Sequence, residues 1–254
     1  MNFDLLEDIS LTLQAGAVEA QNLPRTAVQS LGAFLELAHI FPDYTQETAI
    51  SSWLDRRQFR RFANREQPWF FEDGPQFGFA PMTAISASDT VWIDAANRIK
   101  RLSVEAGFSV DHSGKFVAAI AELMGNTLDH SQRPETGYVA FHVEPRKLEF
   151  VVADRGIGVL SSLNSNPEYT KLADHGRAIE LALSEGISRY PREEGHGFGF
   201  RPLFVGLANI ARSLRFRSGD HCREVARHSD GPPQSRTYEL AALNGFFCAV
   251  TCEV

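Results

Sequence analysis

Cysteine is scarce in this chain of 254 residues, long apolar runs are missing, and basic residues are outnumbered by acidic ones. The three cysteines, Cys222, Cys248 and Cys252, form no CxxC pair, so we expect small buried residues rather than a disulfide framework or a zinc knuckle. No stretch approaches the ~18 apolar residues of a membrane span, and the acidic N-terminus does not resemble a secretory signal. A formal net charge of −7 argues against a nucleic-acid partner. We therefore expect a cytoplasmic protein that contacts no membrane.

The first part of the chain, residues 1–107, is expected to be a mostly helical region of unknown role. Apolar residues recur at helical spacing over residues 26–41, and a second helical pattern runs over residues 88–106. Residues 66–82 combine prolines, glycines and aromatic rings without a period, which favours an ordered loop. His39 lies inside the first apolar pattern, where we expect a buried histidine with satisfied hydrogen bonds rather than a ligand.

Residues 115–131, KFVAAIAELMGNTLDHS, predict an amphipathic helix that carries a polar stripe. Four polar residues fall at i, i+4, i+7 and i+8 and therefore project from one side of this helix: Glu122, Asn126, Asp129 and His130. An amide oxygen can ligate a hard cation, and a carboxylate one turn away can accept a proton from an attacking hydroxyl. The alternative is a solvated helix face that carries ordinary charges.

The apolar pattern changes to alternation over residues 137–154, which predicts a β-hairpin with a short turn at EPRK. Asp154 ends the second strand, where a buried carboxylate needs a donor such as the amino group of a purine base. Gly156 and Gly158 follow in the sequence DRGIG and would let the backbone approach a ligand. The alternative is an ordinary Asp-Xaa-Gly turn at the end of a strand.

A long connection over residues 160–194, with a helix around residues 174–186, is expected to be a lid. It leads into GHGFG, residues 195–199, whose alternate glycines open an amphipathic helix. Backbone amides of such a turn, together with the positive end of the helix, make an anion site suited to a triphosphate. Residues 214–254 look strand-like again and are expected to complete the sheet.

These stretches resemble the boxes of the GHKL superfamily of ATPases, which includes gyrase, the heat-shock chaperone, histidine kinases and MutL. The boxes occur in the family's order as ELMGNTLDHS (122–131), DRGIG (154–158) and GHGFG (195–199). The chain looks most like the branch of anti-sigma-factor serine kinases and stand-alone histidine-kinase-like ATPases. The resemblance implies an α+β fold, the two-layer α/β sandwich called the Bergerat fold, over residues 108–254. In that fold a mixed sheet is covered by helices on one face, and the lid lies at residues 160–194.

The resemblance also implies how the chain would bind ATP and Mg²⁺. Asn126 would ligate Mg²⁺, Glu122 would be the general base, and Asp154 would accept a hydrogen bond from the adenine amino group. The other residues that it places at the nucleotide are Asp129, Gly156, Gly158, Gly195, His196, Gly197, Phe198 and Gly199. The implied function is Mg-dependent phosphoryl chemistry in bacterial-type regulation, by a slow ATPase or a protein serine/histidine kinase-like enzyme. The alternative is a nucleotide-switched regulatory binding module without significant turnover. A regulatory protein partner is expected, and a homodimer is compatible with both functions.

Overall fold

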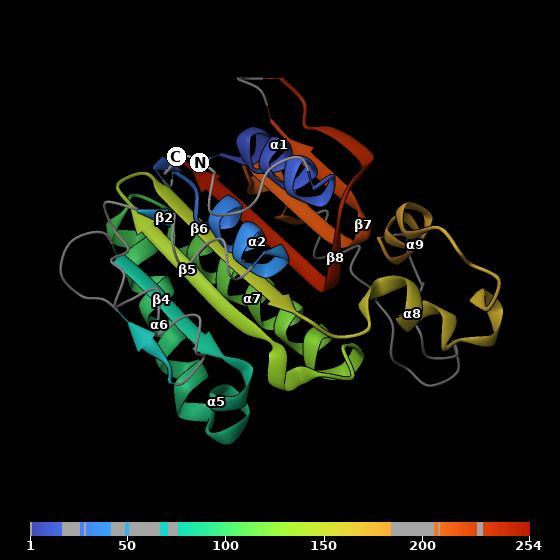
Figure 1. Cartoon of the computed structure of the whole chain (residues 1–254). Coiled ribbons are helices and arrows are strands. Elements are labelled where there is room, and N and C mark those ends of the chain that lie inside the picture. The colour runs from blue at the N-terminus through green and yellow to red at the C-terminus, as the bar shows by residue number, and fades with distance from the viewer. Residues whose placement is uncertain are drawn as a thin grey trace.

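The computed structural model describes residues 2–16, 26–27, 29–41, 49–50, 67–70, 76–183, 206–207, 209–227 and 231–254. This part of the chain is an α+β fold built on one open sheet of six strands (Figure 1). The strand order is β3-β4-β5-β6-β8-β7, and every neighbouring pair is antiparallel. A further pair of two-residue strands, β1 and β2, is parallel and lies outside this sheet.

The strands are β1 (Thr26–Ala27), β2 (Ala49–Ile50), β3 (Trp69–Phe70), β4 (Gln76–Pro81), β5 (Tyr138–Glu144), β6 (Lys147–Asp154), β7 (Ser213–Ala226) and β8 (Gln234–Glu253). The α-helices are α1 (Phe3–Gln14), α2 (Leu31–Ile40), α5 (Met82–Ala87), α6 (Asp89–Glu105), α7 (Val110–His130), α8 (Gly158–Asn164) and α9 (His175–Ala182). Two 3-10 turns, η2 (Pro134–Thr136) and η3 (Pro167–Tyr169), join some of them.

β5 and β6 form the hairpin that the alternating pattern predicts. Glu144 pairs with Lys147, so the connecting turn is as short as expected. Arg146 in this turn has a φ of +66°, a left-handed conformation that tight hairpin turns use. β8 then pairs with β6 along its length, and the last pair sets Asp154 opposite Phe246. The central strand of the sheet therefore ends at the predicted aspartate.

The sheet is buried on both faces because its strands alternate between two hydrophobic clusters. On one face, α6 and α7 pack against it through Ile99, Phe116 and Ile120. On the other face, α2 packs against it through Leu31 and Leu35 (Figure 1). The resemblance implied a mixed sheet with helices on one face. The described sheet is antiparallel and carries helices on both faces, because α2 is apolar on most of its surface and needs a buried place.

Strands from the first part of the chain belong to this same sheet. β4 pairs with β5, with Phe79 opposite Ala140. The expectation of a loop over residues 66–82 is therefore wrong for residues 69–70 and 76–82, which form β3, β4 and the start of α5. Phe77 and Phe79 pack beneath α2 at alternate positions of a short strand, a pattern that the neighbouring prolines and glycines conceal in the sequence. The division between residues 107 and 108 stays a prediction about domains, although strands from both sides of it share one sheet.

The predicted helices are present, with some shifted starts. α6 matches the helix expected over residues 88–106, and α7 starts at Val110, before the expected residue 115. Ser109 caps α7, because its hydroxyl accepts a hydrogen bond from the backbone N–H of His112 at 3.1 Å. α2 begins at Leu31 rather than at residue 26, because Ser30 caps it there. His39 is buried as expected, and its Nε2 atom lies 2.8 Å from the Asn244 carbonyl oxygen.

Residues 160–183 of the segment expected to be a lid are packed against the sheet. Leu163 of α8 and Ile179 of α9 lie in the same hydrophobic cluster as α7. Asp174 caps α9 by accepting a hydrogen bond from the backbone N–H of Arg177 at 2.6 Å. Residues 184–194 lie outside the described residues, so a response of the lid to nucleotide stays a prediction.

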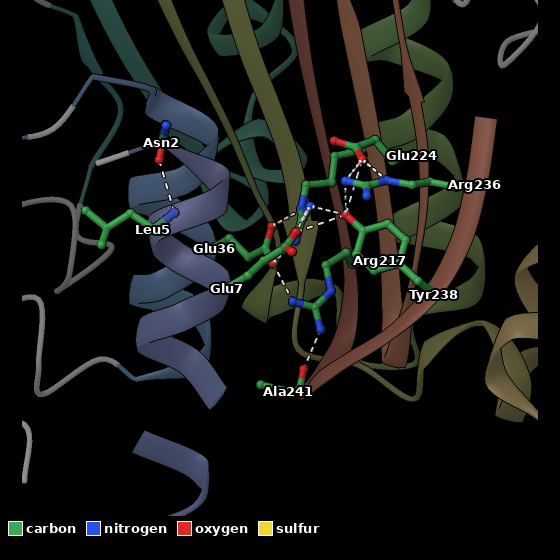
Figure 2. A network of polar contacts seen from close by, with 10 residues as sticks. Asn2, Leu5, Glu7, Glu36, Arg217, Glu224, Arg236, Tyr238 and Ala241 are labelled. Atoms are coloured by element: carbon green, nitrogen blue, oxygen red, sulfur yellow. Dashed lines mark hydrogen bonds and ion pairs between the residues drawn. The ribbon is translucent and has the colours of Figure 1, made fainter. Parts of the chain in front are cut away.

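A buried ionic network fastens α1 and α2 to β7 (Figure 2). Glu36 of α2 is 0% exposed, and its carboxylate binds the guanidinium groups of Arg215, at 2.7 Å, and Arg217. Arg217 also donates to the Ala241 carbonyl, and Glu7 of α1 binds Arg215 at 2.7 Å. Burial would raise the pKa of the Glu36 carboxyl, but the two arginines hold it below its ordinary value. Glu36 is therefore a buried anion with two buried cations.

The three cysteines are buried and free, as their spacing predicts: Cys222, Cys248 and Cys252. Burial raises the pKa of the Cys222 and Cys252 thiols to about 12. Both thiols stay protonated at neutral pH and act as small core residues.

Candidate functional site

Asp154 ends β6 with an almost fully buried carboxylate, which is 2% exposed. Its Oδ1 accepts a hydrogen bond from the Gly156 backbone N–H at 2.8 Å, and its Oδ2 accepts one from Thr127 Oγ1 at 3.3 Å. Burial raises the pKa of this carboxyl to about 6, against the lowering effect of the two hydrogen bonds. Within the described ranges no basic side chain forms an ion pair with it. Each carboxylate oxygen has two acceptor positions, so Asp154 keeps acceptor capacity beyond these two donors.

The α7 helix contacts this carboxylate through Thr127, the residue after Asn126 of the polar stripe. Thr127, which bonds Asp154, is buried, while its neighbour Asn126 is partly buried. The Asn126 Nδ2 atom is buried and makes no hydrogen bond within the described part of the chain. Glu122, one turn earlier, is exposed. The two segments predicted to form a nucleotide site are thus adjacent at Asp154, with an orphaned amide and an accessible carboxylate on the same helix.

The remaining stripe residues lie at the end of α7. Asp129 is exposed and His130 is partly exposed. The side-chain hydrogen bonds to Asp154 come from Thr127 and the Gly156 backbone, so the binding roles expected for Asp129 and His130 stay predictions.

The glycines after Asp154 pack the β6–α8 connection against the end of α7. A Cβ on Gly156 would lie 2.1 Å from the carbonyl oxygen of Ser131, which also accepts a hydrogen bond from the Ile157 N–H at 2.9 Å. Gly156 is therefore required by contact within the protein, whether or not a ligand approaches it. Gly158 is the first residue of α8, and the next N–H, of Val159, donates to Ser218 Oγ at 2.9 Å.

The second glycine segment lies outside the described residues: Gly195, His196, Gly197, Phe198 and Gly199. The phosphate-binding role expected for these residues stays a prediction.

Sequence reasoning missed two residues that shape this site. Thr127 occupies a buried position of α7, on the same face as Ile120 and Leu123. A hydroxyl among these apolar residues could have indicated a buried polar partner. Arg155, between the aspartate and the first glycine, donates to two backbone carbonyls of α2. Nothing in its local sequence indicates that contact, because its partners are more than a hundred residues away.

A comparison with protein-family models, curated proteins and solved structures found no match to this chain. Within the described ranges, no helix combines the length and apolar character needed to cross a membrane.

Mg²⁺ fits this site only as a metal shared with a ligand. The described residues contain no group of three or more His, Cys, Asp or Glu side chains able to hold a metal ion. Mg²⁺ is commonly bound by one or two protein oxygens together with substrate phosphates and water. The amide of Asn126, whose nitrogen is orphaned and whose oxygen could be a ligand, is compatible with that arrangement.

Proposed function

We propose that this chain binds ATP at the end of β6, with Asp154 accepting a hydrogen bond from the adenine amino group. The observation that carries the proposal is the buried Asp154 carboxylate, which has no basic partner among the described residues. A carboxylate that is costly to bury and is only partly satisfied is typical of a binding site rather than of a packing position. An exocyclic amino group is a donor that uses its remaining acceptor capacity.

The arrangement of α7 against β6 supports assigning the fold to the Bergerat type. The N-box-like helix and the DRGIG segment lie side by side, joined by the Thr127–Asp154 and Ile157–Ser131 hydrogen bonds. Two motifs that are separate in the sequence are thereby brought into contact at Asp154. The extra helical layer formed by α1 and α2 would then be an addition to that fold on the opposite face of the sheet.

The proposed activity is Mg-dependent phosphoryl chemistry, as a slow ATPase or a protein kinase. Asn126 would hold Mg²⁺ together with the ATP phosphates, and the bound ion would supply neutralisation of phosphate charge. Glu122 is exposed one turn from Asn126, where it can take a proton from a water or protein hydroxyl. The Thr127 hydroxyl and the Gly156 N–H hold the Asp154 carboxylate in position to accept the hydrogen bond from adenine.

The competing explanation is an Asx turn, in which Asp154 serves only to bond the Gly156 N–H two residues on. Isothermal calorimetry separates the two. We expect the parent protein to bind Mg-ATP and Asp154→Asn to lose this binding while remaining folded. Asp111→Asn is the matched control, because Asp111 is exposed at the other end of α7. A parent that does not bind Mg-ATP, or an Asp154→Asn variant that binds it as tightly, would contradict the proposal.

A further inference from the structure

Arg155 reaches from the candidate site to the helix on the other face of the sheet. Its Nη2 atom donates hydrogen bonds to the carbonyl oxygens of Ala38 and His39, both at 3.2 Å. Its own backbone N–H donates to Thr136 Oγ1 at 2.8 Å. Since Arg155 directly follows Asp154, one residue ties the ligand-facing carboxylate to the C-terminal end of α2.

The charges along β6 match the dipole of α2. The last carbonyls of a helix carry partial negative charge, so the Arg155 guanidinium both satisfies them and interacts favourably with the helix end. At the other end of α2, the Glu149 carboxylate accepts a hydrogen bond from the Leu31 N–H at 2.9 Å. α2 is therefore held at its N-terminus by an anion of β6, Glu149, and at its C-terminus by the cation that directly follows β6, Arg155, next to the site.

A second link joins the end of α2 to the part of β8 that packs against Asp154. His39 Nε2 lies 2.8 Å from the carbonyl oxygen of Asn244, in the irregular part of β8. The next residue, Gly245, packs so closely that a Cβ there would be 2.2 Å from the Asp154 carbonyl oxygen. The end of α2 thus contacts both backbone segments that enclose Asp154.

We infer that Arg155 is a positioning residue that couples the docking of α2 to the geometry of Asp154 and hence to the affinity for nucleotide. The inference rests on the proposed function and deepens it by naming how the site is regulated. A partner or condition that displaces α2 would release the Arg155 clamp and weaken nucleotide binding. By reciprocity, bound nucleotide would hold α2 more firmly against the sheet.

Amide exchange measured without nucleotide tests the coupling itself. The segments to follow are residues 37–41, at the end of α2, and residues 154–158. We expect Arg155→Met to speed exchange in both segments by roughly tenfold, because both side-chain hydrogen bonds to α2 are lost. Arg155→Lys should fall between parent and Arg155→Met, since one ammonium can still donate to a carbonyl. If Arg155→Met does not fold, the same exchange measurements are made on Arg155→Lys.

The matched control is Arg133→Met, which removes an exposed arginine of the neighbouring α7–β5 connection whose side chain lies 3.5 Å from Glu135. It should leave exchange in both segments unchanged. Faster exchange in Arg155→Met that is confined to residues 154–158, or no change at all, would overturn the coupling.

The effect of the coupling on nucleotide affinity is tested with Mg²⁺ and the non-hydrolysable analogue adenylyl imidodiphosphate. Calorimetry measures its binding, and amide exchange measures the response of α2. In the parent, the analogue should slow exchange at the end of α2, and Arg155→Met should bind it roughly tenfold more weakly. If the parent does not bind the analogue, the proposed function fails, and the nucleotide-free exchange still decides the coupling. If parent and Arg155→Met bind it equally and α2 does not respond, the inference fails while the proposed function stands.

Discussion

Thr127 Oγ1 donates a hydrogen bond to Asp154 Oδ2 across 3.3 Å, between residues that are 27 apart in the chain. It joins the predicted helix of one motif to the predicted strand end of the next. It is also the side-chain donor by which α7 helps to keep a buried carboxylate ionised. The position and the charge of Asp154 therefore both depend on α7.

Replacing Thr127 by valine keeps the shape of the side chain and removes this donor. The pKa of Asp154 should rise further above about 6, because the lost hydrogen bond lowers it in the parent. We expect a loss of about 1–3 kcal/mol in the free energy of unfolding at pH 7, and a smaller loss at pH 5, where the carboxyl is largely protonated. Urea unfolding at the two pH values measures this difference.

The control for this variant is Thr90→Val, on an exposed part of α6. Its effect should stay within about 0.5 kcal/mol. A loss in Thr127→Val that is the same at both pH values would mean that the hydroxyl does not act on the charge of Asp154.

Replacing Asp154 by asparagine should change how stability depends on pH. Burial raises the folded-state pKa of Asp154 from 3.8 to about 6, so between these values the folded chain keeps a proton that the unfolded chain has released. The parent therefore loses stability as pH rises through this window, by at most about 3 kcal/mol. Asp154→Asn lacks this loss, so its stability relative to the parent should improve from pH 4 to pH 7.

The measurement is the unfolding free energy of both proteins in urea across this range, with Asp111→Asn as the exposed control. If the difference in unfolding free energy between Asp154→Asn and the parent is the same at every pH, the pKa of the Asp154 carboxyl is not raised by folding. Improved stability at pH 7, together with lost nucleotide binding, would identify Asp154 as a residue kept for binding at the expense of the fold.

Replacing Glu122 by glutamine should separate binding from chemistry. The variant is expected to bind Mg-ATP like the parent, because binding rests on other residues, and to lose about 10²- to 10⁴-fold in turnover. Phosphate release and transfer of labelled phosphate to co-purified protein are the measurements. Glu105→Gln, an exposed glutamate of α6, is the control. If Glu122→Gln turns over like the parent, the regulatory binding module without catalysis becomes the better description.

Replacing Glu36 by glutamine should destabilise the chain far more than the same change at Glu7. It leaves Arg215 and Arg217 buried without their shared carboxylate, which typically costs about 3–5 kcal/mol. Glu7 is partly exposed, so its loss should cost about 0–1 kcal/mol. Urea unfolding at pH 7 compares the two, and equal losses would count against a buried network.

The same network predicts how the stability of the chain changes at acid pH. The folded-state pKa of Glu36 lies below its ordinary value of 4.5, so its contribution is present above that pH. It is lost as pH falls through the lower folded-state pKa. Parent and Glu36→Gln should therefore converge in stability under acid.

The sequence predicted the elements whose signals are local. The alternation over residues 137–154 predicted the hairpin and its end at Asp154, and the helical spacing around Glu122 and Asn126 predicted α7. These patterns are strong because each strand or helix has one dominant apolar face. The α+β class was expected from the resemblance to the GHKL superfamily, and the described residues show it.

The sequence did not indicate how distant segments meet. Nothing in the apolar pattern of residues 26–41 indicates the role of Glu36, because its arginine partners lie on β7, far along the chain. β4 was concealed for a related reason, since its pairing with β5 overrides the prolines and glycines around it. Arg155 carried no local signal, as its acceptors are backbone atoms of α2.

Because side chains of β6 alternate between the two faces of the sheet, the residues at its end contact different helices, α7 on one face and α2 on the other. Leu148, Phe150 and Val152 face the cluster around α7, and Asp154 continues their parity to bond Thr127. Glu149, at the opposite parity, bonds α2, and Arg155 keeps that parity at the other end of the helix. Inserting or deleting one residue between Glu149 and Asp154 would exchange the two sets, turning the guanidinium toward the candidate site and the carboxylate toward the helix carbonyls.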